Sequence, residues 1–117
     1  MEKITPITLT NADTGKTYTL EFNRRTCALA ENAGITLPTL TEEHKIMSVY
    51  PELFYHAFLM HHPQTKKAET DRILFDDLGG FTPELMTRLV ELFAQPYNTL
   101  VKQEEDAPKN AKWSVAL

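Results

Sequence analysis

A run of apolar residues at helical spacing, in the last third of the chain, most constrains the fold. Its members are Leu85, Met86, Leu89, Val90, Phe93, Tyr97, Leu100 and Val101. Spacings of three and four residues place these side chains on one face of an α-helix. Thr82, Pro83 and Glu84 come before the run as an N-cap, a first helical residue and an acidic first turn, and this order is typical of a helix start. The spacing continues through Pro96, so we expect a kink there and not a helix end.

The first 22 residues alternate between apolar and polar side chains, which is the pattern of β-strands. The apolar positions are Ile7 and Leu9, followed by Tyr18, Leu20 and Phe22. Residues 11–16 supply Asn, Asp and Gly between them, and these residues tolerate turn dihedrals. An isolated hairpin is barely stable in water, so its apolar face must pack on helices. The sequence therefore predicts an α+β fold: an N-terminal antiparallel β-hairpin packed on four to five α-helices, with a long kinked C-terminal helix.

Shorter helices are predicted between the hairpin and the last helix, over residues 24–33, 40–50, 52–62 and 66–78. Asn23 is the expected N-cap of the first helix, and Gly34 follows its last turn. That helix carries a face of small residues, which would allow close approach to a neighbour. Residues 39–42 fit a capping box for the second helix. Pro51 either kinks this helix or begins the third as its first residue, and we favour a new helix. The helices are expected to supply the core residues Leu53, Phe54, Phe58, Ile73, Leu74, Leu89 and Phe93, with Leu78 also pointing inward.

The composition is close to that of an average soluble globular domain, with 42% hydrophobic and 24% charged residues among 117. A net charge of −4 argues against nucleic-acid binding. No apolar run approaches the roughly 20 residues that cross a bilayer, and the start of the chain lacks the apolar region of a signal peptide. The single cysteine, Cys27, excludes an internal disulfide. We expect a cytoplasmic protein with one domain, residues 1–106, and a flexible C-terminal tail, residues 107–117.

The histidines do not have the spacing of a metal site. His56 and His61 are five residues apart, which is about 140° around a helix at about 100° per residue. Two ligands on one helix face need a spacing of three or four residues. His62 points about 100° away from His61 on the same helical assumption. We therefore expect no metal-binding residues.

Other reactive residues also lack the partners that catalysis needs. Cys27 has no neighbouring histidine to activate it, so a small buried thiol is the favoured interpretation. Arg24 and Arg25 lie in a first helical turn, where the macrodipole disfavours cations. Solvent exposure or pairing with Glu21 explains them, and an anion site is the alternative. We expect no catalytic or cofactor-binding residues and no enzymatic activity.

The last helix extends beyond what the core of a small domain can cover. From residue 83 to residue 105 it would be about 35 Å long, whereas a globule of this size has a radius of gyration of about 13 Å. An apolar face that extends beyond its own core is typical of helix-in-groove recognition. We therefore predict partner binding by Tyr97, Leu100, Val101 and Trp113. The alternative is that these side chains pack on the hairpin as core.

Several segments together carry a family resemblance. They are YTLEFN at 18–23, FYHAF at 54–58, HP at 62–63, ILFDDLGG at 73–80 with Thr82, LVEL at 89–92, QP at 95–96, and Leu100. The chain resembles a family of small proteins encoded in prophages of Gram-positive bacteria. In size and in its hairpin-plus-helices build it is also similar to the tail assembly chaperones of long-tailed phages.

This resemblance implies a non-enzymatic tail assembly chaperone. Such proteins bind the long, largely helical tape measure protein in the bacterial host cytoplasm and keep it soluble until tail-tube subunits polymerise around it. The expected partners are the tape measure protein and, as a second candidate, the tail-tube protein, with no nucleic acid and no membrane; a homo-oligomer stays open. One alternative is a virion structural component, such as a head–tail connector or a tail-completion protein. A DNA-binding regulator is the alternative from another class, and the acidic charge disfavours it.

Overall fold

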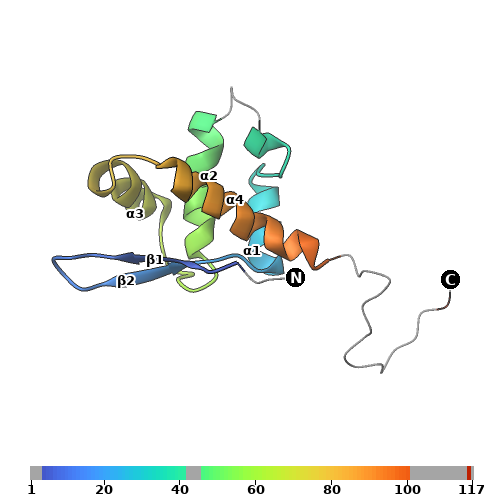
Figure 1. The fold of residues 1–117 in the computed structure, drawn as a ribbon, viewed down its shortest axis with the longest axis horizontal. Helices are drawn as coiled ribbons and strands as arrows, with labels where there is room; N and C mark the ends of the chain where they lie inside the picture. The colour runs from blue at the N-terminus through green and yellow to red at the C-terminus, as the bar shows by residue number, and fades with distance from the viewer. Residues whose placement is uncertain (1–3, 42–45, 101–115, 117) are drawn as a thin grey trace.

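The computed structural model describes residues 4–41, 46–100 and 116, and within them the architecture is α+β, as predicted (Figure 1). The elements in chain order are β1 (Ile7–Thr10), β2 (Thr17–Leu20), α1 (Arg24–Asn32), the 3₁₀ helix η1 (Thr39–Thr41), α2 (Ile46–Phe58), α3 (Lys67–Asp71), the π-helix η3 (Arg72–Asp77) and α4 (Pro83–Asn98). α3 and the hairpin lie at one end of the molecule, whereas α1 and the last turn of α4 lie at the other (Figure 1). α4 packs on both α2 and α1 and so connects the two ends.

The two strands form the predicted antiparallel hairpin, with Ile7 opposite Leu20. In the turn, the Asn11 side chain accepts a hydrogen bond from the Asp13 N–H at 2.8 Å. Gly15 has a φ of +76°, which an L side chain rarely adopts, and its N–H donates to the Asn11 carbonyl at 2.7 Å.

The second strand is shorter than predicted because the chain changes its hydrogen-bonding partner after Leu20. The Glu21 N–H donates to the Ala57 carbonyl of α2 at 3.0 Å instead of continuing the ladder. Phe22, which we predicted within the strand, lies just beyond it but is still buried. The hairpin is therefore joined to α2 by backbone as well as by side chains.

The ends of α1 are as predicted. The Asn23 side chain accepts from the Thr26 N–H at 2.8 Å, and the Thr26 hydroxyl accepts from the Asn23 N–H at 2.9 Å, which completes a capping box. At the other end Gly34 has a φ of +95°, and the Ile35 N–H donates back to the Ala30 carbonyl at 3.0 Å. This is a Schellman ending, and it satisfies carbonyls that the helix leaves open.

The predicted helix start at Pro51 is wrong, because α2 runs through that residue. A proline inside a helix removes one N–H, and the carbonyl that loses its partner here belongs to Met47. Met47 is 85% exposed, so water can satisfy that carbonyl and the cost is small. The predicted capping box at residues 39–42 stays a prediction, because Glu42 lies outside the described residues. The Thr39 hydroxyl donates to the Thr36 carbonyl, just before η1, at 2.7 Å.

The helix predicted over residues 66–78 is present, but its second half is a π-helix. The Leu78 N–H donates to the Ile73 carbonyl, five residues back, at 2.8 Å. Leu74 is fully buried, whereas Phe75 is half-exposed. Leu78, which we predicted to point inward, follows the last π-helical residue and is 45% exposed. That prediction is wrong because the helix ends one residue earlier than expected.

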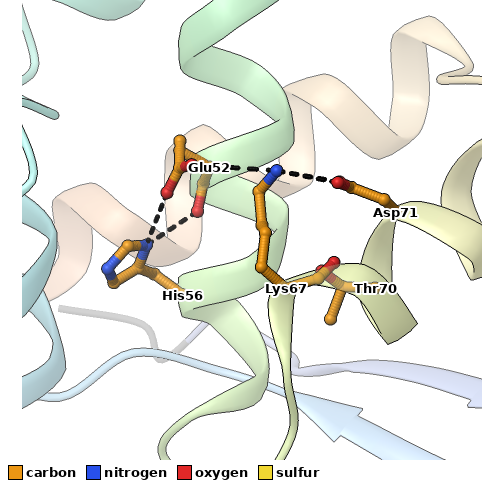
Figure 2. A network of polar contacts seen from close by, with 5 residues as sticks. All are labelled: Glu52, His56, Lys67, Thr70 and Asp71. Atoms are coloured by element: carbon orange, nitrogen blue, oxygen red, sulfur yellow. Dashed lines mark hydrogen bonds and ion pairs between the residues drawn. The ribbon is translucent and has the colours of Figure 1, made fainter.

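A polar network holds α3 against α2 (Figure 2). The Lys67 ammonium contacts the Asp71 carboxylate at 2.9 Å and the Glu52 carboxylate at 3.7 Å. His56 is buried, and its Nδ1–H donates to the Glu52 carbonyl at 2.8 Å. Thr70 is also buried, and its hydroxyl donates to the Lys67 carbonyl at 2.9 Å. The five polar residues drawn in Figure 2 therefore each have a polar partner, which offsets the cost of their desolvation.

The hydrophobic core contains the predicted core residues except Leu78. The fully or nearly fully buried ones are Leu20, Phe22, Leu53, Phe54, Phe58, Leu74, Leu89 and Phe93, and the partly buried ones packed against them are Ile7, Leu9, Tyr18 and Ile73. Aromatic rings pack edge-on through its centre, with ring centroids 5.1 Å apart for Phe54 and Phe58 and 5.2 Å apart for Phe22 and Phe93. α2, α4 and β2 thus share one core.

α4 begins at the predicted N-cap, where the Thr82 hydroxyl accepts from the Leu85 N–H at 3.1 Å. The helix continues through Pro96 and ends at Asn98. The predicted continuation of this helix to residue 105 is wrong, because Thr99 is its C-cap. The predicted tail at 107–117 lies almost entirely outside the described residues. The division of the chain at residue 106 therefore stays a prediction.

Candidate partner-binding groove

Two of the predicted partner-binding residues, Tyr97 and Leu100, line a groove between α1 and the C-terminal end of α4. The groove has a volume of about 190 Å³. Its lining residues are Arg24, Cys27, Ala28 and Glu31 of α1 together with Pro96, Tyr97 and Leu100. The other two predicted residues, Val101 and Trp113, lie outside the described residues. The structure therefore places half of the predicted set around one concave surface.

Small residues of α1 form the floor of the groove. Cys27 is buried, and its thiol donates to the Phe93 carbonyl of α4 at 3.4 Å. Burial, with a smaller contribution from the Glu31 charge, raises the pKa of the Cys27 thiol to about 12. The thiol is therefore neutral at physiological pH and acts as a small apolar residue, as predicted.

Polar side chains stand on both sides of the apolar floor. The Tyr97 hydroxyl donates to the Glu31 carboxylate. Burial of the ring edge and this carboxylate both raise the pKa of Tyr97. On the other side, the Arg24 guanidinium donates to the Thr99 carbonyl at 3.0 Å.

The contact of Arg24 explains why a cation lies in the first turn of α1. Thr99 is the C-cap of α4, and the C-terminal end of a helix carries partial negative charge that favours a cation. The unfavourable dipole of α1 is thus offset by the favourable dipole of α4. We expected solvent exposure or pairing with Glu21; Arg24 is exposed, and its guanidinium contacts a helix terminus.

The groove has room for a side chain but not for a large cofactor. Pockets for drug-sized ligands have volumes of about 300–1,000 Å³, whereas this groove has about 190 Å³. Leu100 at its edge is 65% exposed, and Tyr97 is half-buried against Phe93 with ring centroids 5.4 Å apart. The geometry therefore suits the insertion of one large apolar side chain from a partner.

The contribution of α1 to this groove is not in the predicted site. Arg24, Cys27, Ala28 and Glu31 are spaced at i, i+3, i+4 and i+7, which places them on one helix face. That spacing and the small side chains at its centre are visible in the sequence. The position of this face against the last turn of α4 depends on the tertiary fold.

The three histidines considered as ligands face different partners. α2 ends at Phe58, so the helical angles assumed for His61 and His62 do not apply. The Nε2 atom of His61 lies 2.8 Å from the Glu21 carboxylate, and His62 accepts a hydrogen bond from the Thr19 N–H at 3.0 Å. Within the described ranges, no group of three or more His, Cys, Asp or Glu side chains is arranged to hold a metal ion.

Comparison with known proteins gives a family without an assigned activity. In the part of the chain that the structure describes, no helix combines the length and apolarity needed to cross a membrane. No curated protein and no solved structure matches the chain. One family model matches residues 1–117, so the chain belongs to the family described as "Domain of unknown function (DUF5055)".

Proposed function

We propose that this protein is a non-enzymatic phage tail assembly chaperone, which binds apolar helical segments of the tape measure protein in the cytoplasm of the bacterial host. The α1/α4 groove carries this proposal. It combines an apolar floor with Leu100, a large side chain that is 65% exposed at its edge. A groove of this kind binds the apolar face of a helix.

The proposal includes features that extend beyond the described residues. In it, the C-terminal helix is kinked at Pro96 and is one of four to five helices. Val101, which follows the end of α4, adds to the apolar surface, and Trp113 adds a further apolar contact from the tail. The helical partner then contacts a surface larger than the groove itself.

The test is co-purification with a phage tape measure protein that is produced together with this chain. Leu100→Asp places a charge on the groove edge and should abolish co-purification, because an unpaired charge against an apolar partner is strongly disfavoured. The double variant Leu100→Asp/Val101→Asp should have the same effect. Met47→Asp is the matched control, because Met47 is 85% exposed on α2, outside the groove, and should change nothing.

Stability separates binding from folding in this experiment. Leu100 is mostly exposed, so Leu100→Asp should leave the free energy of unfolding within about 0.5 kcal/mol of the native value. A native-like variant that still co-purifies with the tape measure protein would place the binding surface elsewhere. Presence of the protein in purified phage particles would contradict the chaperone role and indicate a virion component.

A further inference from the structure

The two charged side chains at the groove lie at fixed positions on α1. Arg24 and Glu31 are seven residues apart, which is two helical turns and about 10.5 Å along the axis. Each is fixed by α4, Arg24 through the Thr99 carbonyl and Glu31 through the Tyr97 hydroxyl. A positive and a negative charge therefore stand on either side of the apolar floor.

Both charged groups are exposed and have hydrogen-bonding capacity beyond these contacts. Among the described residues, Arg24 uses Nη2 for the Thr99 carbonyl, whereas a guanidinium has five N–H donors. Glu31 accepts from Tyr97 at Oε1, and a carboxylate has about four acceptor positions. Each side chain is thus held in place and can still pair with a charge on a bound helix.

We infer that the groove recognises a helix by charge as well as by apolar contact. The bound helix inserts one leucine-sized side chain over Cys27 and Ala28. It carries one acidic and one basic residue about two turns apart, which pair with Arg24 and Glu31. This inference rests on the proposed function, because it takes the groove as the helix-binding site.

Three synthetic helical peptides test the inference. All carry a central leucine, and the two flanking positions, seven residues apart, hold Lys and Glu, Lys and Lys, or Glu and Glu. The Lys/Glu peptide meets an opposite charge at both positions in one of its two orientations along α1, whereas each of the others meets one like charge in either orientation. Exposed ion pairs are individually weak, so we expect the Lys/Glu peptide to bind about five- to tenfold more tightly. This preference should decrease at high salt.

Substitutions on α1 should change the preference in a defined way. Arg24→Glu makes both flanking charges negative, so this variant should prefer the Lys/Lys peptide. Arg24→Gln/Glu31→Gln removes both charges but keeps a donor for Thr99 and an acceptor for Tyr97, so it should bind the three peptides equally. Thermal melts of both variants check that the fold is retained.

The result also separates this inference from the proposed function. Equal binding of all three peptides to the native protein, or binding of none, would overturn the charge inference. Loss of tape measure co-purification in Leu100→Asp would still support the proposed function in that case. If the charge preference is found but the native protein does not capture the tape measure protein, the inference about the groove holds and the proposed function fails.

Discussion

Two parts of the predicted apolar stripe lie in different surroundings. In the middle of α4, Phe93 is fully buried and packs edge-on against Phe22. Just beyond Asn98, where α4 ends, Leu100 is 65% exposed. Large aromatic side chains cover the middle of the stripe, whereas the end faces the small residues Cys27 and Ala28 of α1.

The comparison shows that helical spacing in the sequence predicts which face a side chain lies on but not how deeply it is buried. A side chain on the apolar face becomes buried only when its neighbours are large enough to fill the space around it. The short side chains of Cys27 and Ala28 leave part of that space open, and the result is a groove. Such a surface adds little to stability and is therefore suited to binding.

The largest expected effect comes from making the same substitution within α4 and just beyond its end. Leu89 is fully buried, so Leu89→Ala should lower the free energy of unfolding by about 2–5 kcal/mol through lost burial and a cavity. Leu100→Ala should change it by about 0.5 kcal/mol or less. Urea denaturation of both variants measures the difference. Equal losses would mean that Leu100 is covered in solution and that the end of α4 belongs to the core.

Much of the fold could be predicted because its signals are local. Alternation in the hairpin and the spacing of Leu89 and Phe93 predicted the core face of each element correctly. The path of the chain at Pro51 could not be predicted in this way. If the helical path ended at Pro51, Leu53 and Phe54 would lose their buried positions. The free energy of that burial outweighs one missing hydrogen bond in an exposed turn. The rule that proline begins or ends a helix does not take into account the apolar surface that the following residues bury.

The candidate site was predicted only in part for a similar reason. Tyr97 and Leu100 belong to a stripe that is visible in the sequence. Glu31, by contrast, reaches the site because its carboxylate accepts a hydrogen bond from Tyr97, 66 residues further along the chain. Contacts at that separation are set by how the helices pack, which residue spacing within one helix does not determine.

The stability of the protein at alkaline pH should depend on Cys27, at the floor of the groove. The pKa of the Cys27 thiol is raised from 9.0 to about 12, so the unfolded chain loses this proton at lower pH than the folded chain. Stability should therefore be complete below about pH 9 and decrease as the pH rises above it. Thermal melts at about pH 8 and about pH 10 should show a larger loss for the native protein than for Cys27→Ala. Parallel losses in both would exclude a buried thiol.

The stability of the protein at acid pH should depend on His62, at the hairpin end of the molecule. This is the smallest of the expected effects. His62 packs edge-on against Tyr18 with ring centroids 5.0 Å apart, and its Nε2 accepts from the Thr19 N–H. Burial, then the charges of His61 and Lys16, lower the pKa of His62 below 6.5. The unfolded chain therefore binds this proton more readily, so the contribution of His62 is complete above about pH 6.5 and decreases as the pH falls below it.

A glutamine at this position separates the hydrogen bond from the titration. His62→Gln keeps an oxygen that can accept from Thr19 but has no charge to gain, so its stability should decrease less than that of the native protein between about pH 7 and about pH 5. His61→Gln is the matched control, because His61 contacts Glu21 and not the strand; it should retain most of the acid loss due to His62, since burial is the larger cause of the lowered pKa of His62. The same acid loss in His62→Gln as in the native protein would mean that protonation of His62 does not cause that loss.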